Sequence, residues 1–573
     1  MEMQTEKCDV LIIGSGGAGL RAAIEAHDNG ATVFLVGKTL LGKAHTVMAE
    51  GGINAALGNM DKEDNWKVHF MDTWREGQYL GHPKAVELLA KRAPDAILEL
   101  EQWGALFDRT PDGKIMQRPF GAHTYRRTCH IGDRTGLEIM TVMVEQAKKR
   151  GIKNFEEVYI TRLLSDGKKV SGALGIDIKK GEGLLFNSKA VILATGGCAR
   201  VYRTSTNPWE NVGDGHALAY NIGAELQDME MMQFHPTSMV YPETAKGILV
   251  TESVRGEGGT LLNSKGERFM EKYDPNRLEL GPRDEVARAI FTEIHKGNAT
   301  SHGGVWLDIT HKPMDYILKK LPKMHKQFKD FAGVDITKER MEVAPAAHYS
   351  MGGVAAEPET GSMRVKGLYA CGEVTAGVHG ANRLGGNSLT DILVFGKIAG
   401  KEAASYSKNT TFPGIREKEI EDEWENITRP FKNKGSKPQK IKGEVASVMW
   451  DNVGLFMTEK SLNRALGVLE KRKKELGNVS VSGGMVYNPE WMDYLDLRSM
   501  LVSCEAIIRS ALFRKESRGA HFREDYPEKS KEWLVNIFAA KRGEKMVLYK
   551  KPVPLLTDEL KEELGEYYEK NKG

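Results

Sequence analysis

A cluster of glycines near the N-terminus has the spacing that binds the phosphates of a dinucleotide. Gly14, Gly16 and Gly19 follow the apolar run 8–13 and open an alanine-rich stretch that reaches Asn29. In such a turn the first glycine permits a tight bend, the second lets the backbone approach a pyrophosphate, and the third packs helix against strand. The helix N-terminus also favours negative charge. The motif predicts a dinucleotide cofactor but does not separate FAD from NAD.

Two further features follow the next apolar run, at 32–36. Where an acidic residue usually binds the cofactor ribose, this chain has Gly37 and Lys38, so we expect the ribose contact to come from elsewhere. His45 then precedes the pair Gly51-Gly52, in a loop of small residues. A lone histidine in a loop is usually a surface or packing residue, and its type alone assigns His45 no role.

The elements that must position these residues are a strand, a helix and a second strand within residues 8–36. The segments KAVILATGG (189–197) and LYACGEV (368–374) repeat the pattern of a strand followed by glycine. We therefore expect one α/β nucleotide-binding domain assembled from distant parts of the chain, with other domains inserted. Turns and a strand-like run occupy 236–344, and the sequence from 406 is rich in Lys and Glu with helical periodicity.

Composition excludes several classes of protein. The 573 residues carry 81 Lys and Arg against 78 Asp and Glu, which is too balanced for a nucleic-acid partner. We find no run of about 18–20 apolar residues that would span a membrane and no signal peptide. The sequence therefore predicts a cytoplasmic protein whose membrane attachment, if present, comes from a partner. Five scattered cysteines without a CxxC pair exclude a disulfide scaffold and an iron–sulfur cluster held by this chain alone, and no metal site is predicted.

Seven polar motifs identify a family resemblance that covers about residues 8 to 525. They are AHTVMAEGG (44–52), QFHPT (233–237), TESVRGEGG (251–259), GPRDEVARA (281–289), AHYSMGG (347–353), HGANRLGGNSL (379–389) and RKESRGAHFRED (514–525). In this order they resemble the flavoprotein subunits of succinate dehydrogenases and fumarate reductases. The resemblance implies a discontinuous Rossmann-like FAD-binding domain (1–235 and 345–405), an inserted α+β capping domain (236–344), a C-terminal helical domain (406–525) and a tail region (526–573).

The resemblance also selects FAD as the cofactor and implies that His45 carries it covalently. The other residues that it implies as FAD contacts are Gly14, Ser15, Gly16, Gly17, Ala18, Gly19, Lys38, Thr46, Gly51, Gly52, Asp214, Glu373, Ser388 and Leu389. The spacing from Glu373 to Arg383 is one residue shorter than in the common bacterial enzymes, which leaves the intervening loop unassigned.

A four-carbon dicarboxylate needs cationic or donor groups at both ends. By resemblance these groups are His235, Thr251, His348 and Arg383, with Gly52 beside them. Arg383 suits bidentate capture of a carboxylate by its planar guanidinium.

Arg283 is the implied proton donor and acceptor. An isolated arginine hardly deprotonates at neutral pH, but the family uses the arginine of the PRD motif in this way. Glu252 and Arg255 match the relay that reprotonates it.

The implied reaction interconverts fumarate and succinate. Its electrons are exchanged with an iron–sulfur partner subunit, which in turn can work with further electron-carrier or membrane-anchor subunits. Glu50, the residue before Gly51, favours the fumarate reductase direction over the succinate dehydrogenase direction. One other enzyme alternative is a thiol-driven fumarate reductase. Another is an L-aspartate oxidase-like activity, and His45 argues against this second alternative. A non-catalytic flavin-binding or assembly subunit would not need Arg283, His348 and Arg383 together.

Overall fold

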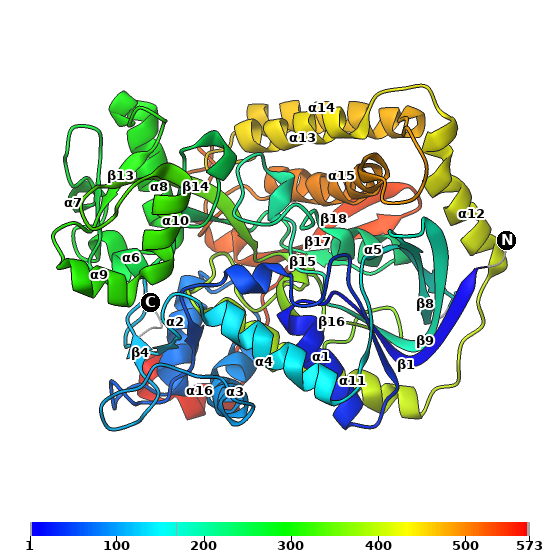
Figure 1. Cartoon of the computed structure of the whole chain (residues 1–573), viewed down its shortest axis with the longest axis horizontal. Coiled ribbons are helices and arrows are strands. Elements are labelled where there is room, and N and C mark those ends of the chain that lie inside the picture. Colours follow the sequence, from blue (N-terminus) through cyan, green and yellow to red (C-terminus); the bar gives the residue numbers. More distant parts are fainter. Residues whose placement is uncertain (1–2, 168, 570–573) are drawn as a thin grey trace.

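The computed structural model describes residues 3–167 and 169–569. A mixed seven-stranded sheet, called the central sheet below because side chains of helices pack on both of its faces, lies toward the right in Figure 1. Its order is β6-β2-β1-β9-β8-β7, and β16 also pairs with β9. The strands are β1 (Gln4–Ile13), β2 (Val33–Val36), β6 (Lys153–Phe155), β7 (Val158–Ser165), β8 (Val170–Asp177), β9 (Glu182–Leu193) and β16 (Leu368–Ala370). The pairings among β6, β2, β1, β9 and β16 are parallel, so the glycine turns that follow β1, β9 and β16 meet at one edge of the sheet.

The two faces of this sheet belong to different hydrophobic cores. Leu11 and Ile13 of β1 pack in one core and Val10 and Ile12 in the other, because successive strand side chains point to opposite faces. Helices α1 (Gly17–Asp28), α4 (Thr135–Lys149) and α11 (Asn387–Lys408) cover one face. Helices α5 (Asp214–Ile222) and α15 (Pro489–Phe513) contribute to the core on the other face (Figure 1).

A second sheet, with strand order β11-β14-β13-β12, forms the centre of a separate lobe (Figure 1). Its strands are β11 (Met232–Met239), β12 (Thr260–Leu262), β13 (Val305–Asp308) and β14 (Met341–Ser350). Its helices are α6 (Ser253–Gly256), α7 (Met270–Tyr273), α8 (Arg283–Glu293), α9 (Met314–Lys320) and α10 (Pro322–Ala332). A core of its own holds the lobe together, and the long strands β11 and β14 carry the chain from this lobe to the rest of the molecule.

A small sheet of three two-residue strands and two helices lies in the first third of the chain. The strands are β3 (Ile53–Asn54), β4 (Gln117–Arg118) and β5 (Thr128–Cys129). Helix α2 (Trp66–Glu76) begins after Asn65, whose side chain accepts two backbone N–H groups. Helix α3 (Pro83–Gln102) begins with a proline, which has no N–H to leave unpaired.

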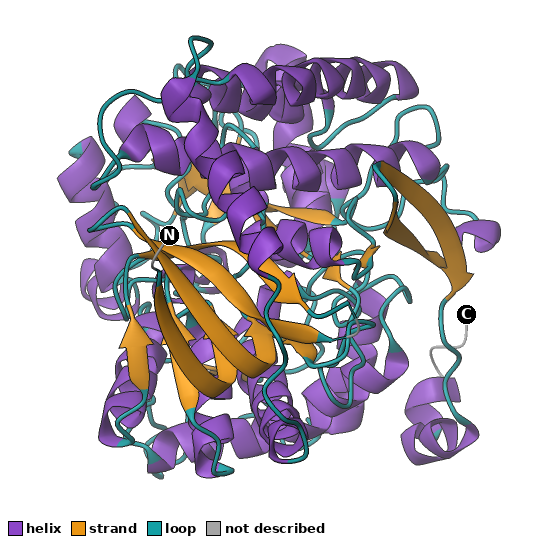
Figure 2. Cartoon of the chain, turned by 90° about the vertical axis from the view of Figure 1, so that its right-hand side faces the viewer, coloured by secondary structure: helices purple, strands orange, loops and turns teal. Residues whose placement is uncertain are grey.

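The C-terminal third is helical up to residue 513 and then forms a β-hairpin and two short helices. Helices α12 (Glu417–Thr428), α13 (Pro438–Asn452), α14 (Glu459–Glu475) and α15 pack against one another and the central sheet. The Lys/Glu-rich end of the chain forms a hairpin of β17 (Val535–Arg542) and β18 (Lys545–Pro552), which joins β10 (Leu226–Gln227) and β15 (Gly353–Val354) in a four-stranded sheet. Figure 2 shows this hairpin apart from the central sheet, followed by the short helices α16 (Asp558–Leu564) and α17 (Glu566–Glu569).

The architecture predicted from the sequence is therefore present: a discontinuous α/β domain, an inserted α+β unit and a C-terminal helical unit. Among the described residues, no helix combines the length and apolar character that a membrane crossing requires.

Candidate active site

A cavity of about 750 Å³ opens at the edge of the central sheet where the parallel strands end. Ile13 and Val36 line it at the ends of β1 and β2, and Ala194 and Cys371 line it just after β9 and β16. The cavity continues to the inserted lobe, where Leu249 and Arg283 form part of its wall. One continuous space thus joins the predicted cofactor side to the predicted substrate side.

Nearly all the predicted residues line this cavity. The predicted cofactor residues on its wall are Gly14, Ser15, Gly16, Gly17, Ala18, Lys38, His45, Thr46, Gly51, Gly52, Asp214, Glu373, Ser388 and Leu389. The predicted substrate and catalytic residues on its wall are His235, Thr251, Glu252, Arg283, His348 and Arg383. Two predicted residues, Gly19 and Arg255, lie behind the wall.

The N-terminus of α1 faces the cavity without an acidic partner. Its N-cap, Gly16, provides no side-chain cap, and the first turn contains no Asp or Glu. Thr46 Oγ accepts the N–H of Gly17 at 3.2 Å, and the positive end of the helix dipole is otherwise open to the cavity. These open N–H groups can bind a pyrophosphate, so the site is suited to the pyrophosphate of FAD.

Two glycines of the turn are required by close packing. Gly14 has a φ of +117°, and a Cβ there would lie 2.1 Å from the carbonyl oxygen of Ala194. A Cβ on Gly19 would lie 1.8 Å from the carbonyl oxygen of Gly14. Gly19 therefore allows helix and strand to approach each other and has no direct place on the cavity wall.

Lys38 takes part in a half-buried charge cluster on the cofactor side. Its Nζ lies 3.0 Å from Asp214 Oδ2 and 2.5 Å from Asp496 Oδ1, and the hydroxyl of Tyr159 donates to Asp214 Oδ1 at 2.9 Å. Burial opposes the charge, but the two carboxylates raise the pKa of Lys38 above its ordinary value. Strand β2 is not followed by the usual acidic residue, but two carboxylates from elsewhere in the chain, Asp214 and Asp496, lie next to Lys38.

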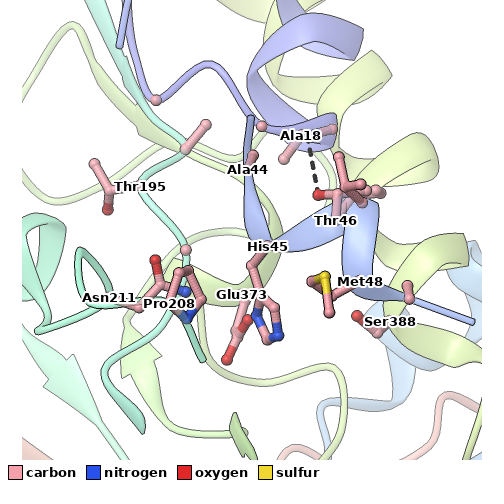
Figure 3. A pocket seen from close by; sticks show the side chains of 18 of the residues that line it. Ala18, Ala44, His45, Thr46, Met48, Thr195, Pro208, Asn211, Glu373 and Ser388 are labelled. Atoms are coloured by element: carbon pink, nitrogen blue, oxygen red, sulfur yellow. Dashed lines mark hydrogen bonds between the residues drawn. The ribbon is translucent and has the colours of Figure 1, made fainter. Parts of the chain in front are cut away.

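His45 begins a short 3-10 helix (His45–Met48) and projects into the cavity near Glu373, Met48 and Ser388 (Figure 3). Its ring centroid lies 6.2 Å from that of His348. Burial, together with the positive charge of Arg383, lowers the pKa of His45 to about 4. A neutral imidazole with a free nitrogen is the form of histidine that can bond covalently to an electrophilic carbon.

Two histidines and two arginines face one another in the inner part of the cavity. The rings of His235 and His348 are 5.0 Å apart, centroid to centroid. The guanidinium of Arg383 lies 4.2 Å from the ring centroid of Tyr349, and Arg383 and Arg283 both donate to Gln233 Oε1, at 3.1 Å and 3.3 Å.

Burial and positive charge lower the pKa values of three of these groups, His235, His348 and Arg383. Burial and then Arg283 hold the pKa of His235 well below its usual range, and burial and then His235 do so for His348. Burial and then Arg283 lower the pKa of Arg383 to about 10. Because the positive charge of Arg283 opposes that of Arg383, an anion bound here would relieve the repulsion between them.

Arg283 is held by a buried carboxylate. Its Nε donates to Glu252 Oε2 at 2.8 Å, and its Nη2 lies 2.6 Å from the same oxygen. Arg255 Nη2 lies 3.8 Å from Glu252 Oε2, so Glu252 stands between the two guanidinium groups. Burial opposes ionisation of Glu252, but Arg283 and Arg255 hold its pKa far below the ordinary value. The three side chains form the row Arg283–Glu252–Arg255 that the sequence predicted as a relay.

Several residues on the cavity wall were not predicted from the sequence. They include Phe120, Tyr159, Tyr349, Leu249 and Asn211. Tyr349 and the nearby Gln233 lie inside motifs already recognised, so their motifs could have indicated them. Asp496 gave no signal, because it lies on α15, far along the chain from Lys38.

The cysteines and acidic groups of the described chain form no metal centre. Cys8, Cys129, Cys198, Cys371 and Cys504 are buried and free. Among residues 3–167 and 169–569, no group of three or more His, Cys, Asp or Glu side chains is arranged to hold a metal ion.

Comparison with known proteins gives consistent matches over nearly all of the chain. Residues 9–389 match the model of an FAD binding domain, and residues 442–563 match that of the fumarate reductase flavoprotein C-terminus. The chain is 47% identical over 545 residues to a fumarate reductase (CoM/CoB) subunit of Methanothermobacter marburgensis, covering 95% of this chain and 99% of that protein.

Two further matches extend this likeness. The chain is 37% identical over 585 residues to the succinate dehydrogenase flavoprotein subunit of Rickettsia conorii, covering 97% of each chain. Among solved structures, the quinol fumarate reductase of E. coli superimposes with a TM-score of 0.92 at 33% identity, covering 97% of this chain and 98% of that one.

Proposed function

The chain belongs to the family of fumarate reductase and succinate dehydrogenase flavoprotein subunits, and we propose that it reduces fumarate to succinate. The family makes it an FAD-dependent oxidoreductase. The observation that carries the specific proposal is the continuity of the cavity: the glycine turn and His45 lie at one end, and His235, His348 and Arg383 at the other. When bound, FAD supplies the hydride at N5.

The substrate end is suited to an anion with two carboxylates. Arg383 offers a planar pair of donors to one carboxylate, while His235, His348 and Thr251 offer single donors to the other. The stacking of Arg383 on Tyr349 and its hydrogen bond to Gln233 fix the guanidinium before the substrate arrives. Such preorganised donors stabilise the charge that develops on a carboxylate-bearing carbon in the transition state.

Arg283 completes the reaction by proton transfer. One olefinic carbon of fumarate receives a hydride and the other a proton, which together give succinate. Arg283 gives this proton, and the row Glu252–Arg255 returns one to it.

The direction of the reaction, fumarate reduction and not succinate oxidation, is proposed on two grounds. Glu50 lies on the cavity wall and favours fumarate reduction, and the 47% identical relative is named a fumarate reductase. The alternative is succinate oxidation, since another relative is a succinate dehydrogenase subunit. The words CoM/CoB in the name of the first relative support a thiol-driven reductase as the second candidate for the electron source.

The cofactor and partners follow from the same features. We propose that His45 carries FAD covalently, because its neutral ring projects into the cavity. We propose an iron–sulfur partner subunit, because the five cysteines are scattered and buried and the relatives are named as subunits. On this proposal the protein works in the cytoplasm and reaches a membrane only through partner subunits.

Arg283→Ala tests the proposed function. We expect the variant to keep its flavin spectrum and to lose viologen-driven fumarate reduction by at least about 100-fold, the lower range for general acid catalysis. The measurement is the steady-state rate at saturating fumarate. Substantial residual turnover would remove Arg283 from proton transfer.

The flavin itself provides the control for this variant. On a denaturing gel, parent and Arg283→Ala should both show flavin fluorescence on the polypeptide, whereas His45→Ser should not. Extractable flavin in the parent would contradict the covalent bond without affecting the test of Arg283.

A further inference from the structure

His348 has one ring nitrogen left for the cavity. Its Nδ1 lies 2.7 Å from Thr206 Oγ1, on the loop that follows β9, and Asn207 Nδ2 donates to the His348 carbonyl at 2.7 Å. The ring lines the cavity, so Nε2 is the atom that can meet a ligand there. Because burial and the surrounding positive groups keep this histidine neutral, only one of its two nitrogens carries a proton.

The neighbours of Thr206 determine where its hydroxyl proton points. Within the described chain, this hydroxyl has one other acceptor in hydrogen-bonding range, the carbonyl oxygen of Ala347, 3.5 Å away. That oxygen already accepts the N–H of Thr206 at 3.0 Å and the hydroxyl of Ser205 at 3.1 Å, which occupy its two lone pairs. The hydroxyl of Thr206 therefore donates to His348 Nδ1, and the proton of the ring resides on Nε2.

We infer that Thr206 is a positioning residue that fixes His348 in the tautomer with Nε2–H, so that the ring donates a hydrogen bond to a substrate carboxylate. The opposite tautomer would present a lone pair to the carboxylate and repel it. This inference rests on the proposed function, since it takes a dicarboxylate as the ligand of His348.

The neighbouring His235, in contrast, has both an acceptor and a donor beside its Nδ1. Its Nδ1 lies 2.8 Å from the carbonyl oxygen of Thr237 and 3.2 Å from the N–H of the same residue. Either tautomer of His235 therefore finds a partner, whereas the hydroxyl of Thr206 supports one tautomer of His348. The two histidines are adjacent but not equivalent.

Binding of succinate and malonate to the oxidised holoenzyme, followed by the flavin absorbance, tests the inference. Thr206→Val keeps the shape of the side chain and removes the hydroxyl, and we expect it to raise Kd about tenfold, as the loss of one hydrogen bond to a charged group implies. Thr206→Ser, which restores the hydroxyl, should stay within about twofold of the parent. Thr204→Val, on the same loop, gives a matched control that should bind as the parent does.

A double substitution shows whether Thr206 acts through His348. In a His348→Gln background, Thr206→Val should cause no further loss of binding. A full additional tenfold loss in that background would overturn the inference, as would parent-like binding by Thr206→Val alone or binding by Thr206→Ser as weak as that of Thr206→Val. If Thr206→Val does not fold, Thr206→Ala provides the same comparison. Failure of the parent to bind either dicarboxylate would instead overturn the proposed function, and this inference with it.

Discussion

At the scale of single residues, the site combines buried positive groups with few buried carboxylates. Arg283, Arg383 and Arg255 are all buried, and Glu252 is the carboxylate between two of them. Removing one partner from such a pair leaves an uncompensated buried charge, so these residues depend on one another. A bound dicarboxylate would complete the charge balance, which links substrate binding to the stability of the site.

Glu50 is a second buried carboxylate on the cavity wall and allows a test by pH. Its Oε1 lies 2.7 Å from Lys323 Nζ of α10, yet burial raises its pKa from 4.5 to about 7, against the opposing effect of Lys323. The folded protein therefore binds more protons than the unfolded chain between these two values. The stability contribution of the protonated group is complete below pH 4.5 and is lost as pH rises through 7.

Glu50→Gln should remove this pH dependence, because glutamine resembles the protonated side chain at every pH. We expect the Tm of the variant, relative to the parent, to increase by a few degrees between pH 5 and pH 8. Calorimetric scans of the holoenzymes at constant ionic strength measure the effect. Glu417→Gln, at an exposed position on α12, is the control. Parallel Tm curves for the parent and Glu50→Gln would contradict the prediction.

At the scale of elements, the loop that carries Arg383 is supported by a turn from the far end of the chain. Ala520 N–H donates to the carbonyl oxygen of Ala381 at 2.9 Å, and Arg288 of α8 donates to the carbonyl of Gly519 at 2.8 Å. Gly519 has a φ of +55°, and a Cβ there would lie 2.5 Å from the Ala381 oxygen. The approach of the turn to the loop therefore needs a glycine.

Gly519→Ala should displace the loop and with it the guanidinium of Arg383. We expect the KM for fumarate to rise about tenfold or more, because small misplacements of binding groups are costly. Gly543→Ala is a matched control: its φ of +60° is similar, and a Cβ there meets nothing within 4 Å. Both variants carry similar backbone strain. An equal change of KM in the two variants would show that strain alone, and not contact with Ala381, causes the effect.

The elements also show how far the sequence predicts this fold. The glycines Gly14, Gly16 and Gly19 were recognisable because each position in their spacing has a steric reason, and they run from the end of β1 into α1 as expected. The hairpin of β17 and β18 was not recognised, because its frequent lysines resemble a solvated tail. Strand β17 pairs with β10, about 310 residues earlier in the chain, and local patterns do not reveal such a distant partner.

At the scale of the whole molecule, the site joins segments that local sequence cannot bring together. Lys38 meets Asp496 of α15, and β11 and β14 carry His235 and His348 from the inserted lobe to the cofactor side. The lobes also contact each other at α10, where Asp133 accepts the N–H groups of Lys323 and Met324 at 2.8 Å and 3.2 Å. The residue types of the site could be predicted from motifs, whereas these junctions required the structure.

The reoxidation of reduced flavin by fumarate is the direct test of the proposed fumarate reduction. The holoenzyme is reduced with dithionite without oxygen and mixed with fumarate in a stopped-flow instrument, and the flavin absorbance is recorded. Oxidised flavin should return in a single turnover with one succinate formed per flavin, and Arg283→Ala should stay reduced. A parent protein that stays reduced in the presence of excess fumarate would contradict this proposal.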